Sequence, residues 1–458
     1  MPSRTALDDR ILKPELHTLD YGSGKGLDVT RLRQVGIPVT GWDPYFANEV
    51  SPSESDVVLL TYVLNVIEEP AERISTLRAA WELTRNVLIV STRLSWDARR
   101  VHGEELEDGV VTTRNTFQHL FQPSELKRLV EQVTNAHCVS ARPGVVYAFR
   151  NDNDRLAYLA RKTMPSFDWS NSDDFATALR LVVSFTEARG RLPLVEEIPD
   201  EVREMLSRTA WSELRKLIHR ASDPERLASG SKRSTLDTLL YLGIALFNGR
   251  GRLSSMPLSV QADIRSHFTS FKEACARADR LLLKLRDDSY LRGAMRNSVG
   301  KMTPSALYVH ERAMASMPVV LRLYEHCGAV AAGRPADFTL VKLHHDKRAV
   351  AWLGYPDFDK DPHPRTAWSY HVTFPSLDTG YEDYSARANR PLLHRKEEFL
   401  ATNDPMRDKY ARLTSAEMAA GLYSNPSVIG TEVGWQGELL RCGVELRGHR
   451  LVKAASSG

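Results

Sequence analysis

The stretch LDYGSGKG (residues 19–26) decides how the first third of this chain folds. A short apolar run ending at Tyr21 is typical of a strand, and the run LDVTRLRQVG (27–36) has the spacing of an amphipathic helix that ends at glycine. Three glycines between them indicate a turn in which the backbone takes positive φ or comes close to a ligand. The stretch therefore predicts a strand, a ligand-binding turn and a helix.

The alternation of strands and helices continues over residues 1–150. Further strands are expected at IPVTGWDPY (37–45), DVVLLTYVLNVI (56–67) and NVLIVSTRL (86–94), helices at 69–85 and 124–133, and a closing hairpin at 137–150. Helices between successive strands imply right-handed crossovers. We therefore expect an α/β fold with a doubly wound, mostly parallel sheet.

The pattern changes beyond residue 150. Residues 151–300 show helical periodicity, and residues 201–300 hold 18 Lys or Arg against 11 Asp or Glu. Two basic segments rich in Gly and Ser, 229–234 and 248–255, are expected to be loops. Residues 301–458 combine an expected helix (306–327) with strand-like runs at 337–345, 349–355 and 368–374. The sequence thus predicts a helical, locally basic module and a C-terminal α+β module.

Composition excludes a disordered chain and leaves the partner open. Of 458 residues, 42% are hydrophobic and 26% charged, and the net charge of +3 favours no partner class. Four cysteines lie far apart without metal-ligand spacing, which favours reduced thiols and no metal. Because the N-terminus has no apolar leader and no run is long enough for a membrane span, we expect a cytoplasmic protein with no membrane partner.

Two acidic residues narrow the ligand of the predicted turn. A carboxylate at Asp20 would repel a pyrophosphate but suits the ammonium of an amino-acid group. The glycine spacing also differs from that of a dinucleotide loop. Asp43, at the end of the next strand, can accept hydrogen bonds from both hydroxyls of a ribose. Each acid alone could simply stabilise a turn or end a strand, but together they favour S-adenosylmethionine. The expected cofactor contacts are Asp20, Gly22, Ser23, Gly24, Gly26 and Asp43.

This pattern resembles the class I, Rossmann-like S-adenosylmethionine-dependent methyltransferases over residues 1–150. The resemblance rests on DYGSGKG, GWDPY, the strand that starts at Asp56, and NTFQHLFQPSELKRLVEQ (115–132). One feature departs from that family: about ten residues separate the second strand from DVVLL, so the usual intervening helix and strand are shortened or missing. The adenine contact that the family places there is therefore not assigned.

A closer resemblance extends over nearly the whole chain. DYGSGKGLDV, GWDP, YVLNVIEEPAER, YPDFDKDPHP, LLHRKE and VELRGHRLV are similar to the DNA phosphorothioation-associated methyltransferases. That resemblance implies a role in DNA modification, restriction-modification or defence, with DNA and phosphorothioation-system proteins as partners.

The acceptor pocket is expected after the strand that begins at Asp56. DNA amino-methyltransferases usually place a (D/N/S)-P-P-(Y/F) loop there, and this chain has Thr61-Tyr62-Val63-Leu64-Asn65 instead. Tyr62 could stack on an acceptor and Asn65 could accept a hydrogen bond from an amine, and these two are the candidate catalytic residues. Alternatively, Tyr62 packs in the protein and Asn65 caps the helix that begins near Pro70.

Basic residues in two regions are candidate DNA contacts, because lysine and arginine neutralise backbone phosphates. The candidates are Arg93, Arg99, Arg100, Lys232, Arg233, Arg250 and Arg252. Trp96 among the first three could stack on a base, although a solvated loop explains this segment equally well.

A polar cluster (342–347, 355–363 and 394–397) allows three interpretations. It could be a nuclease-like metal site, turn acids with ion-paired neighbours, or a phosphate-binding surface formed by Lys342, Lys347, Arg395 and Lys396.

We therefore expect a methyltransferase acting on nucleic acid, in particular DNA. The alternatives are a DNA-binding defence component that keeps the cofactor fold without turnover, and a methyltransferase of RNA or of a small molecule.

Overall fold

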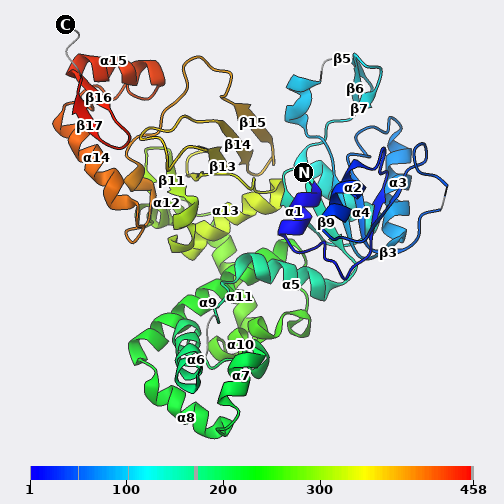
Figure 1. Ribbon diagram of the computed structural model, residues 1–458, viewed down its shortest axis with the longest axis horizontal. Coiled ribbons are helices and arrows are strands. Elements are labelled where there is room, and N and C mark those ends of the chain that lie inside the picture. The colour runs from blue at the N-terminus through cyan, green and yellow to red at the C-terminus, as the bar shows by residue number, and fades with distance from the viewer. Residues whose placement is uncertain (1, 50, 102, 170–173, 455–458) are drawn as a thin grey trace. The chain divides into compact units, whose positions relative to one another are not determined.

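The computed structural model describes all residues except 1, 50, 102, 170–173 and 455–458, and the side chains of Arg99 and Arg100 also lie outside the description. The chain divides into two compact units. The first contains residues 1–150 and 288–458, and the second contains residues 151–287 (Figure 1).

The N-terminal part of the first unit is built on a six-stranded sheet of order β2-β1-β3-β4-β9-β8. Its strands are β1 (Thr18–Tyr21), β2 (Val39–Trp42), β3 (Ser55–Thr61), β4 (Thr84–Ser91), β8 (Cys138–Arg142) and β9 (Val145–Phe149). Strands β1 to β4 pair in parallel, whereas β9 runs antiparallel to β4 and β8. The predicted α/β fold with a mostly parallel sheet is confirmed.

Burial explains why these segments form the centre of the sheet. Residues 57–60 of β3 have no exposed surface, as expected for a parallel strand covered on both faces. The helices of this part are α1 (Pro2–Asp8), α2 (Leu27–Gln34), α3 (Pro70–Glu82) and α4 (Pro123–Thr134). Leu77, Leu126 and Val130 of α3 and α4 pack into the same core as β3 and β4. Because β1 pairs in parallel with both β2 and β3, the carboxyl ends of these three strands lie side by side.

The second crossover is short, as the sequence predicts. Between β2 and β3 the described residues, 43–49 and 51–54, contain no helix or strand beyond an isolated bridge between Asp43 and Ala47. Strand β2 is consequently the edge of the sheet. After β4 the chain forms η1 (Ser95–Arg100) and a small antiparallel sheet of β5 (Gly103–Leu106), β6 (Gly109–Thr112) and β7 (Phe117–Gln118).

The second unit is helical, as expected from its periodicity. Its elements are α5 (Asp152–Thr163), α6 (Phe175–Arg189), η2 (Val195–Glu197), α7 (Asp200–Leu206), α8 (Trp211–Ala221), α9 (Pro224–Phe247), η3 (Leu253–Ser255), α10 (Leu258–His267) and α11 (Phe271–Lys284).

The predicted loop at 229–234 is wrong, because this segment lies inside helix α9. Asp223 caps the helix through the amides of Glu225 and Arg226, and an apolar run from residue 239 to 245 anchors the rest of it in the core. Gly230 is needed for close packing rather than for a turn, since a Cβ there would lie 1.9 Å from the carbonyl oxygen of Glu187 in α6. The second predicted loop, 248–255, is irregular up to residue 252 and then forms η3.

The C-terminal part of the first unit contains a fully antiparallel six-stranded sheet, β10 to β15 in sequence order. Its strands are β10 (Lys301–Met302), β11 (Ala306–His310), β12 (Leu340–His344), β13 (Ala349–Gly354), β14 (Trp368–Thr373) and β15 (Thr379–Asp383). Helix α13 (Val319–Ala332) packs on this sheet, and the buried Trp352 indole donates a hydrogen bond to Glu325 at 3.0 Å. The predicted helix at 306–327 is wrong before Val319, because residues 306–310 form β11, a short 3-10 helix follows at Glu311–Ser316, and α13 begins only at Val319.

The remaining elements follow or flank that sheet. They are α12 (Asp288–Arg296), η4 (Glu311–Ser316), η5 (Lys396–Phe399), α14 (Arg407–Ala419), α15 (Glu432–Cys442), and the hairpin strands β16 (Val444–Leu446) and β17 (Leu451–Lys453). Among the residues that the structure describes, no helix has both the length and the hydrophobicity to cross a bilayer.

Candidate functional site

The glycine turn after β1 adopts the backbone conformation that its sequence predicts. Gly22, Gly24 and Gly26 have φ values of +85°, +52° and +73°, a region that other residues rarely enter. The amides of Gly22 and Ser23 donate to the carbonyl oxygen of Trp42 at 2.7 and 3.0 Å, which ties the turn to the end of β2. A Cβ on Gly24 or Gly26 would meet no atom within 4 Å, so both face open space. The turn thus leaves room for a ligand to approach its backbone.

Asp20 is a buried acid at the end of β1. The residue is 2% exposed, its Oδ1 is fully buried, and no hydrogen bond to its side chain is present among the described residues. Burial, together with the nearby charges of Asp28 and Asp43, raises the pKa of Asp20 to about 7. An unpartnered buried acid is costly, and an ammonium group placed against it would restore the ionised form. Asp20 therefore fits the amino group of a methionine moiety.

Asp43 holds the turn together. Its Oδ2 accepts a hydrogen bond from the amide of Gly24 at 2.9 Å, and its Oδ1 accepts from the amides of Tyr45 and Phe46 at 2.9 and 3.0 Å. A carboxylate has about four acceptor positions, so one is left, on Oδ2. This conformation leaves room for one ribose hydroxyl at Asp43 instead of the expected two.

Two exposed aromatic side chains that were not among the expected site residues follow this acid in the chain. Tyr45 and Phe46 are 88% and 63% exposed. They follow Asp43 in the short segment that replaces the usual second crossover. An aromatic plane next to a candidate ribose site can stack on a nucleobase. The signal in the sequence is a pair of adjacent aromatic residues in the short segment between two strands.

The loop after β3 lies against the glycine turn. A Cβ on Gly22 would come within 2.5 Å of Val63 Cγ2, so the two loops are in contact. The preceding residue, Tyr62, has φ +59°, a strained conformation for an aromatic residue, and is 46% exposed. Burial and then the charge of Asp97 raise the pKa of Tyr62, an effect that Arg93 partly offsets. The Tyr62 phenol thus stays protonated at neutral pH, available for stacking or for donating a hydrogen bond.

Asn65, the other candidate catalytic residue, is buried and not presented to an acceptor. It is 1% exposed, and its amide nitrogen donates to Gln118 Oε1 at 2.9 Å. Its Oδ1 is buried without a hydrogen-bond partner. It does not cap α3 either, because Glu69 occupies that position and makes no side-chain cap. In this conformation Asn65 connects the loop after β3 to strand β7.

A charged network beside Asn65 has no counterpart in the sequence analysis. Arg73 donates two hydrogen bonds of 2.6 Å to Asp108 in the β5–β6 turn. His119 contacts the Asp108 carbonyl through Nδ1 at 2.6 Å and Glu125 through Nε2 at 3.1 Å. Burial acts to lower the pKa of His119, but the hydrogen bonds to Glu125 and Asp108 outweigh it and raise the pKa. The network joins the small sheet to α3 and α4.

The candidate DNA contacts differ in solvent exposure and in ion pairing. Arg93, Lys232, Arg233 and Arg252 are exposed, whereas the side chains of Arg99 and Arg100 lie outside the described residues. Arg250 is not free, because its guanidinium is ion-paired with Asp279 at 2.5 Å and donates to the carbonyl oxygen of Leu242.

Trp96 packs inside the protein. Its ring stacks against Tyr381 at 5.9 Å between centroids and meets the edge of Tyr370 at 5.0 Å. Both tyrosines belong to the C-terminal sheet. Trp96 therefore helps to join the two parts of the first unit rather than offering a platform for a base.

The polar cluster at 342–397 matches the interpretation of turn acids with ion-paired neighbours. Asp359 accepts hydrogen bonds from Arg312 at 3.2 Å and from the Tyr410 hydroxyl at 2.8 Å. His363 bonds to Glu417 at 2.7 Å. Lys396 is 2% exposed and so cannot form a phosphate-binding surface. Within the described part of the chain, no group of three or more His, Cys, Asp or Glu side chains is placed to hold a metal ion.

Comparison with known proteins identifies the N-terminal part. Residues 4–134 match a family model described as a methyltransferase domain. Among curated proteins, none matches the chain.

Solved structures similar to this chain are methyltransferases. One is the 1,6-didemethyltoxoflavin-N1-methyltransferase of Burkholderia thailandensis with bound S-adenosylhomocysteine (16% identity, 32% of this chain and 78% of that chain, TM-score 0.23). Another is the magnesium protoporphyrin IX methyltransferase of Synechocystis PCC 6803 (16%, 33% and 80%, TM-score 0.24). A third is the CcbJ methyltransferase of Streptomyces caelestis (16%, 32% and 88%, TM-score 0.24).

The matching family model, the mostly parallel sheet and the glycine turn with its buried acid agree with one another. Residues 4–134 therefore have the sequence signature and the α/β fold of a methyltransferase domain.

Proposed function

We propose that this protein transfers a methyl group from S-adenosylmethionine to nucleic acid, specifically DNA, in a phosphorothioation-linked modification system. The observation that carries the cofactor assignment is the unpartnered Asp20 carboxylate beside the left-handed glycine turn. S-adenosylmethionine supplies an electrophilic methyl group on a sulfonium. Asp20 would hold the ammonium of the cofactor, and the open space at Gly24 and Gly26 would let the cofactor lie against the backbone of the turn. Asp43 would keep the turn in place and accept a hydrogen bond from one ribose hydroxyl.

The acceptor side is supported by the loop after β3. Methyl transfer is an in-line displacement, so the protein mainly has to align the acceptor and exclude water. Tyr62 is partly exposed next to the glycine turn, and its strained backbone is the kind of feature that functional sites retain. A protonated phenol can stack on an extruded base and donate a hydrogen bond to it.

DNA as the substrate is supported by exposed basic side chains and by motif resemblance. Lys232, Arg233 and Arg252 of the second unit are exposed, and no acidic partner of theirs is found among the described residues. Lysine and arginine in this state can neutralise backbone phosphates. The phosphorothioation context rests on the sequence motifs alone.

One assay distinguishes the acceptors. Tritiated methyl transfer should be measured with duplex DNA, with the same duplex carrying phosphorothioate linkages, and with tRNA. We expect transfer to DNA, lost in Tyr62→Ala. Transfer to tRNA alone would refute the DNA assignment, and cofactor binding without transfer to any acceptor would favour the DNA-binding component that lacks turnover.

Calorimetry tests the cofactor separately. We expect S-adenosylmethionine to bind the wild type and binding to be lost or strongly weakened in Asp43→Ala, because the turn loses three hydrogen bonds. A wild-type protein that does not bind the cofactor would refute the whole proposal.

A further inference from the structure

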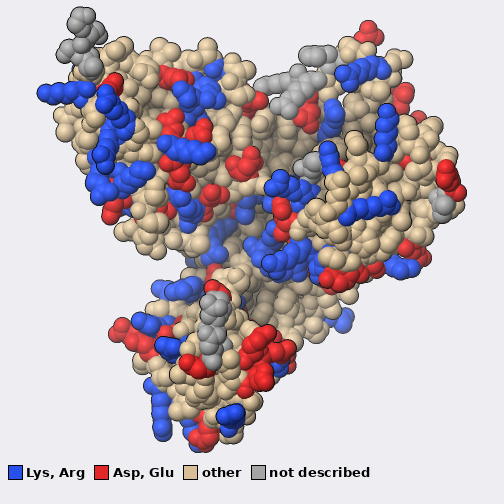
Figure 2. Space-filling view, in the orientation of Figure 1, with Lys and Arg blue, Asp and Glu red and all other residues tan. Residues whose placement is uncertain are grey.

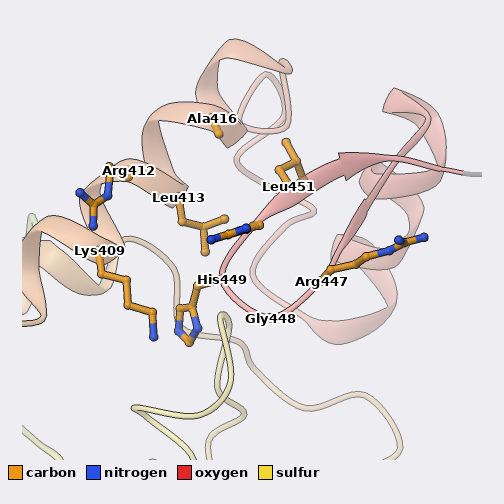
Figure 3. Close-up of a pocket in the computed structure, with 9 residues that line it drawn as sticks. Lys409, Arg412, Leu413, Ala416, Arg447, Gly448, His449 and Leu451 are labelled. Carbon is orange, nitrogen blue, oxygen red and sulfur yellow. The ribbon is translucent and has the colours of Figure 1, made fainter.

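A cavity in the C-terminal part lies between helix α14 and the β16–β17 hairpin. Its volume is about 820 Å³. Figure 3 shows its lining, which comes from one face of the helix and from the turn of the hairpin. The lining residues are Lys409, Arg412, Leu413, Ala416, Arg447, Gly448, His449, Arg450 and Leu451. These residues lie far from the glycine turn in sequence.

The charges around this cavity are of one sign. Every polar side chain that lines it belongs to Lys, Arg or His, and none belongs to an acid. Arg447 is ion-paired with Glu445 at 2.8 Å, whereas no ion pair to Lys409, Arg412 or Arg450 is found among the described residues. Figure 2 shows Lys and Arg side chains gathered along the edge formed by α14 and the hairpin. Three uncompensated cations thus surround one hollow.

The histidine in the lining is oriented by a buried lysine. His449 Nε2 lies 3.0 Å from Lys396 Nζ, which also donates to the carbonyl oxygens of Phe358 and Asp361 at 2.6 and 2.7 Å. Because Nε2 accepts from the lysine, neutral His449 carries its proton on Nδ1 and is itself a donor. Burial, followed by the charges of Lys396 and Lys409, lowers the pKa of His449 to about 4. The lining therefore offers hydrogen-bond donors and positive potential.

The size and lining of the cavity indicate a chain of phosphates rather than a single one. A volume of about 820 Å³ is much larger than one phosphate group. The cations come from two separate elements, and Leu413, Ala416 and Leu451 add apolar lining that suits sugar carbons. Arg412 and Arg450 are exposed, so a ligand can extend past the rim.

We propose that this cavity binds the sugar–phosphate backbone of duplex DNA, with Lys409, Arg412 and Arg450 neutralising successive phosphates. That the polymer is DNA rests on the proposed function, whereas the presence of a phosphate-binding site is inferred from the positive charge of the cavity. This site would hold the duplex at the C-terminal part of the protein and would not read the base sequence, as is usual for phosphate contacts.

The test is a salt series of DNA affinity. Binding of a fluorescent 24-base-pair duplex is measured by anisotropy without cofactor for the wild type and for Arg412→Gln/Arg450→Gln. Each lost phosphate contact lowers the slope of log affinity against log salt by about 0.9. The double variant should therefore lose about 1.8 from the slope and bind on the order of 50-fold more weakly at 0.1 M salt. A matched control, Arg85→Gln/Arg387→Gln, removes two exposed arginines that are ion-paired with Glu54 and Glu382, and should change the slope little.

Each outcome decides the question. Unchanged affinity and slope in the double variant would overturn the proposal, as would an equal loss in the control. A tRNA that binds more tightly than the duplex would also overturn it. If the variant loses DNA affinity but the wild type methylates no acceptor, the proposed function fails and the binding site stands.

Discussion

Replacing Asp20 by asparagine should stabilise the free protein and abolish tight cofactor binding at the same time. Burial raises the pKa of Asp20 from 3.8 to about 7, so ionising it in the folded state is unfavourable. The asparagine side chain would have nearly the same shape and no charge to bury. A gain in stability together with a loss of function is expected of a residue kept for its ligand.

The magnitude follows from the shift in pKa. A group whose folded pKa is raised contributes its full stability below the unfolded pKa and loses it as pH rises toward the folded pKa. With 3.8 and about 7 as the two values, the penalty in the wild type is about 1.6 kcal/mol at pH 5 and roughly 4 kcal/mol at pH 8. These figures are upper bounds, since protein relaxation screens part of the cost. The Asp20→Asn variant should therefore be more stable than the wild type at pH 8, and the substitution should be nearly neutral below pH 4.

The assay is thermal and denaturant unfolding of the protein without cofactor at pH 4, 5 and 8, with the exposed Asp337→Asn as a control. For a unit of this size, roughly 4 kcal/mol corresponds to a midpoint shift on the order of 5 °C. Calorimetry with S-adenosylmethionine should show affinity falling below pH 7 in the wild type, together with proton release on binding, because the ligand requires the ionised Asp20. The variant should show neither effect.

The reasoning would be refuted by a variant that is no more stable than the wild type at pH 8. It would equally be refuted by unchanged cofactor affinity in the variant. In either case Asp20 would be a turn-stabilising residue, the alternative that the sequence leaves open.

Three further outcomes are expected. Gly24→Ala should weaken S-adenosylmethionine binding at least tenfold in calorimetry and cost about 1 kcal/mol of stability, because of the positive φ at this position. Gly22→Ala should destabilise the fold further, because its Cβ would meet Val63 at 2.5 Å. Unchanged cofactor affinity in Gly24→Ala would contradict the inference that the ligand approaches the backbone at Gly24. Tyr62→Gly should relieve backbone strain and raise thermal stability by about 1 kcal/mol while lowering the single-turnover methyl-transfer rate, and an unchanged rate would exclude Tyr62 from the acceptor pocket. His119→Gln should destabilise the protein more at pH 6 than at pH 9, because a raised folded pKa gives stability that is lost as pH rises through it; unfolding curves that shift equally at both pH values would contradict this.

The sequence alone determined the architecture of the N-terminal domain and its ligand turn. Hydrophobic pattern and glycine placement are local properties: the apolar run 57–60 predicts a strand covered on both faces, and glycines at 22, 24 and 26 predict a backbone with positive φ. The short second crossover could also be predicted, since ten residues cannot hold a helix and a strand.

Other features were decided only by the tertiary structure. Residues 229–234 have the composition of a basic Gly/Ser loop, yet Gly230 is the contact point of two helices, because close packing and turn formation both select glycine. Asn65 and Trp96 were expected to face the substrate. Instead, Asn65 is buried and donates a hydrogen bond to Gln118, and Trp96 packs against Tyr381.

The cationic cavity is likewise a feature that only the tertiary structure reveals. Lys409, Arg412 and Arg450 lie in separate segments, and nothing in a local pattern indicates that a helix and a hairpin turn bring them around one hollow. The unpartnered state of Asp20 is likewise a property of everything packed around it. Local sequence predicts the backbone conformation of the glycine turn, whereas the environment of a charge depends on residues that are distant in the chain.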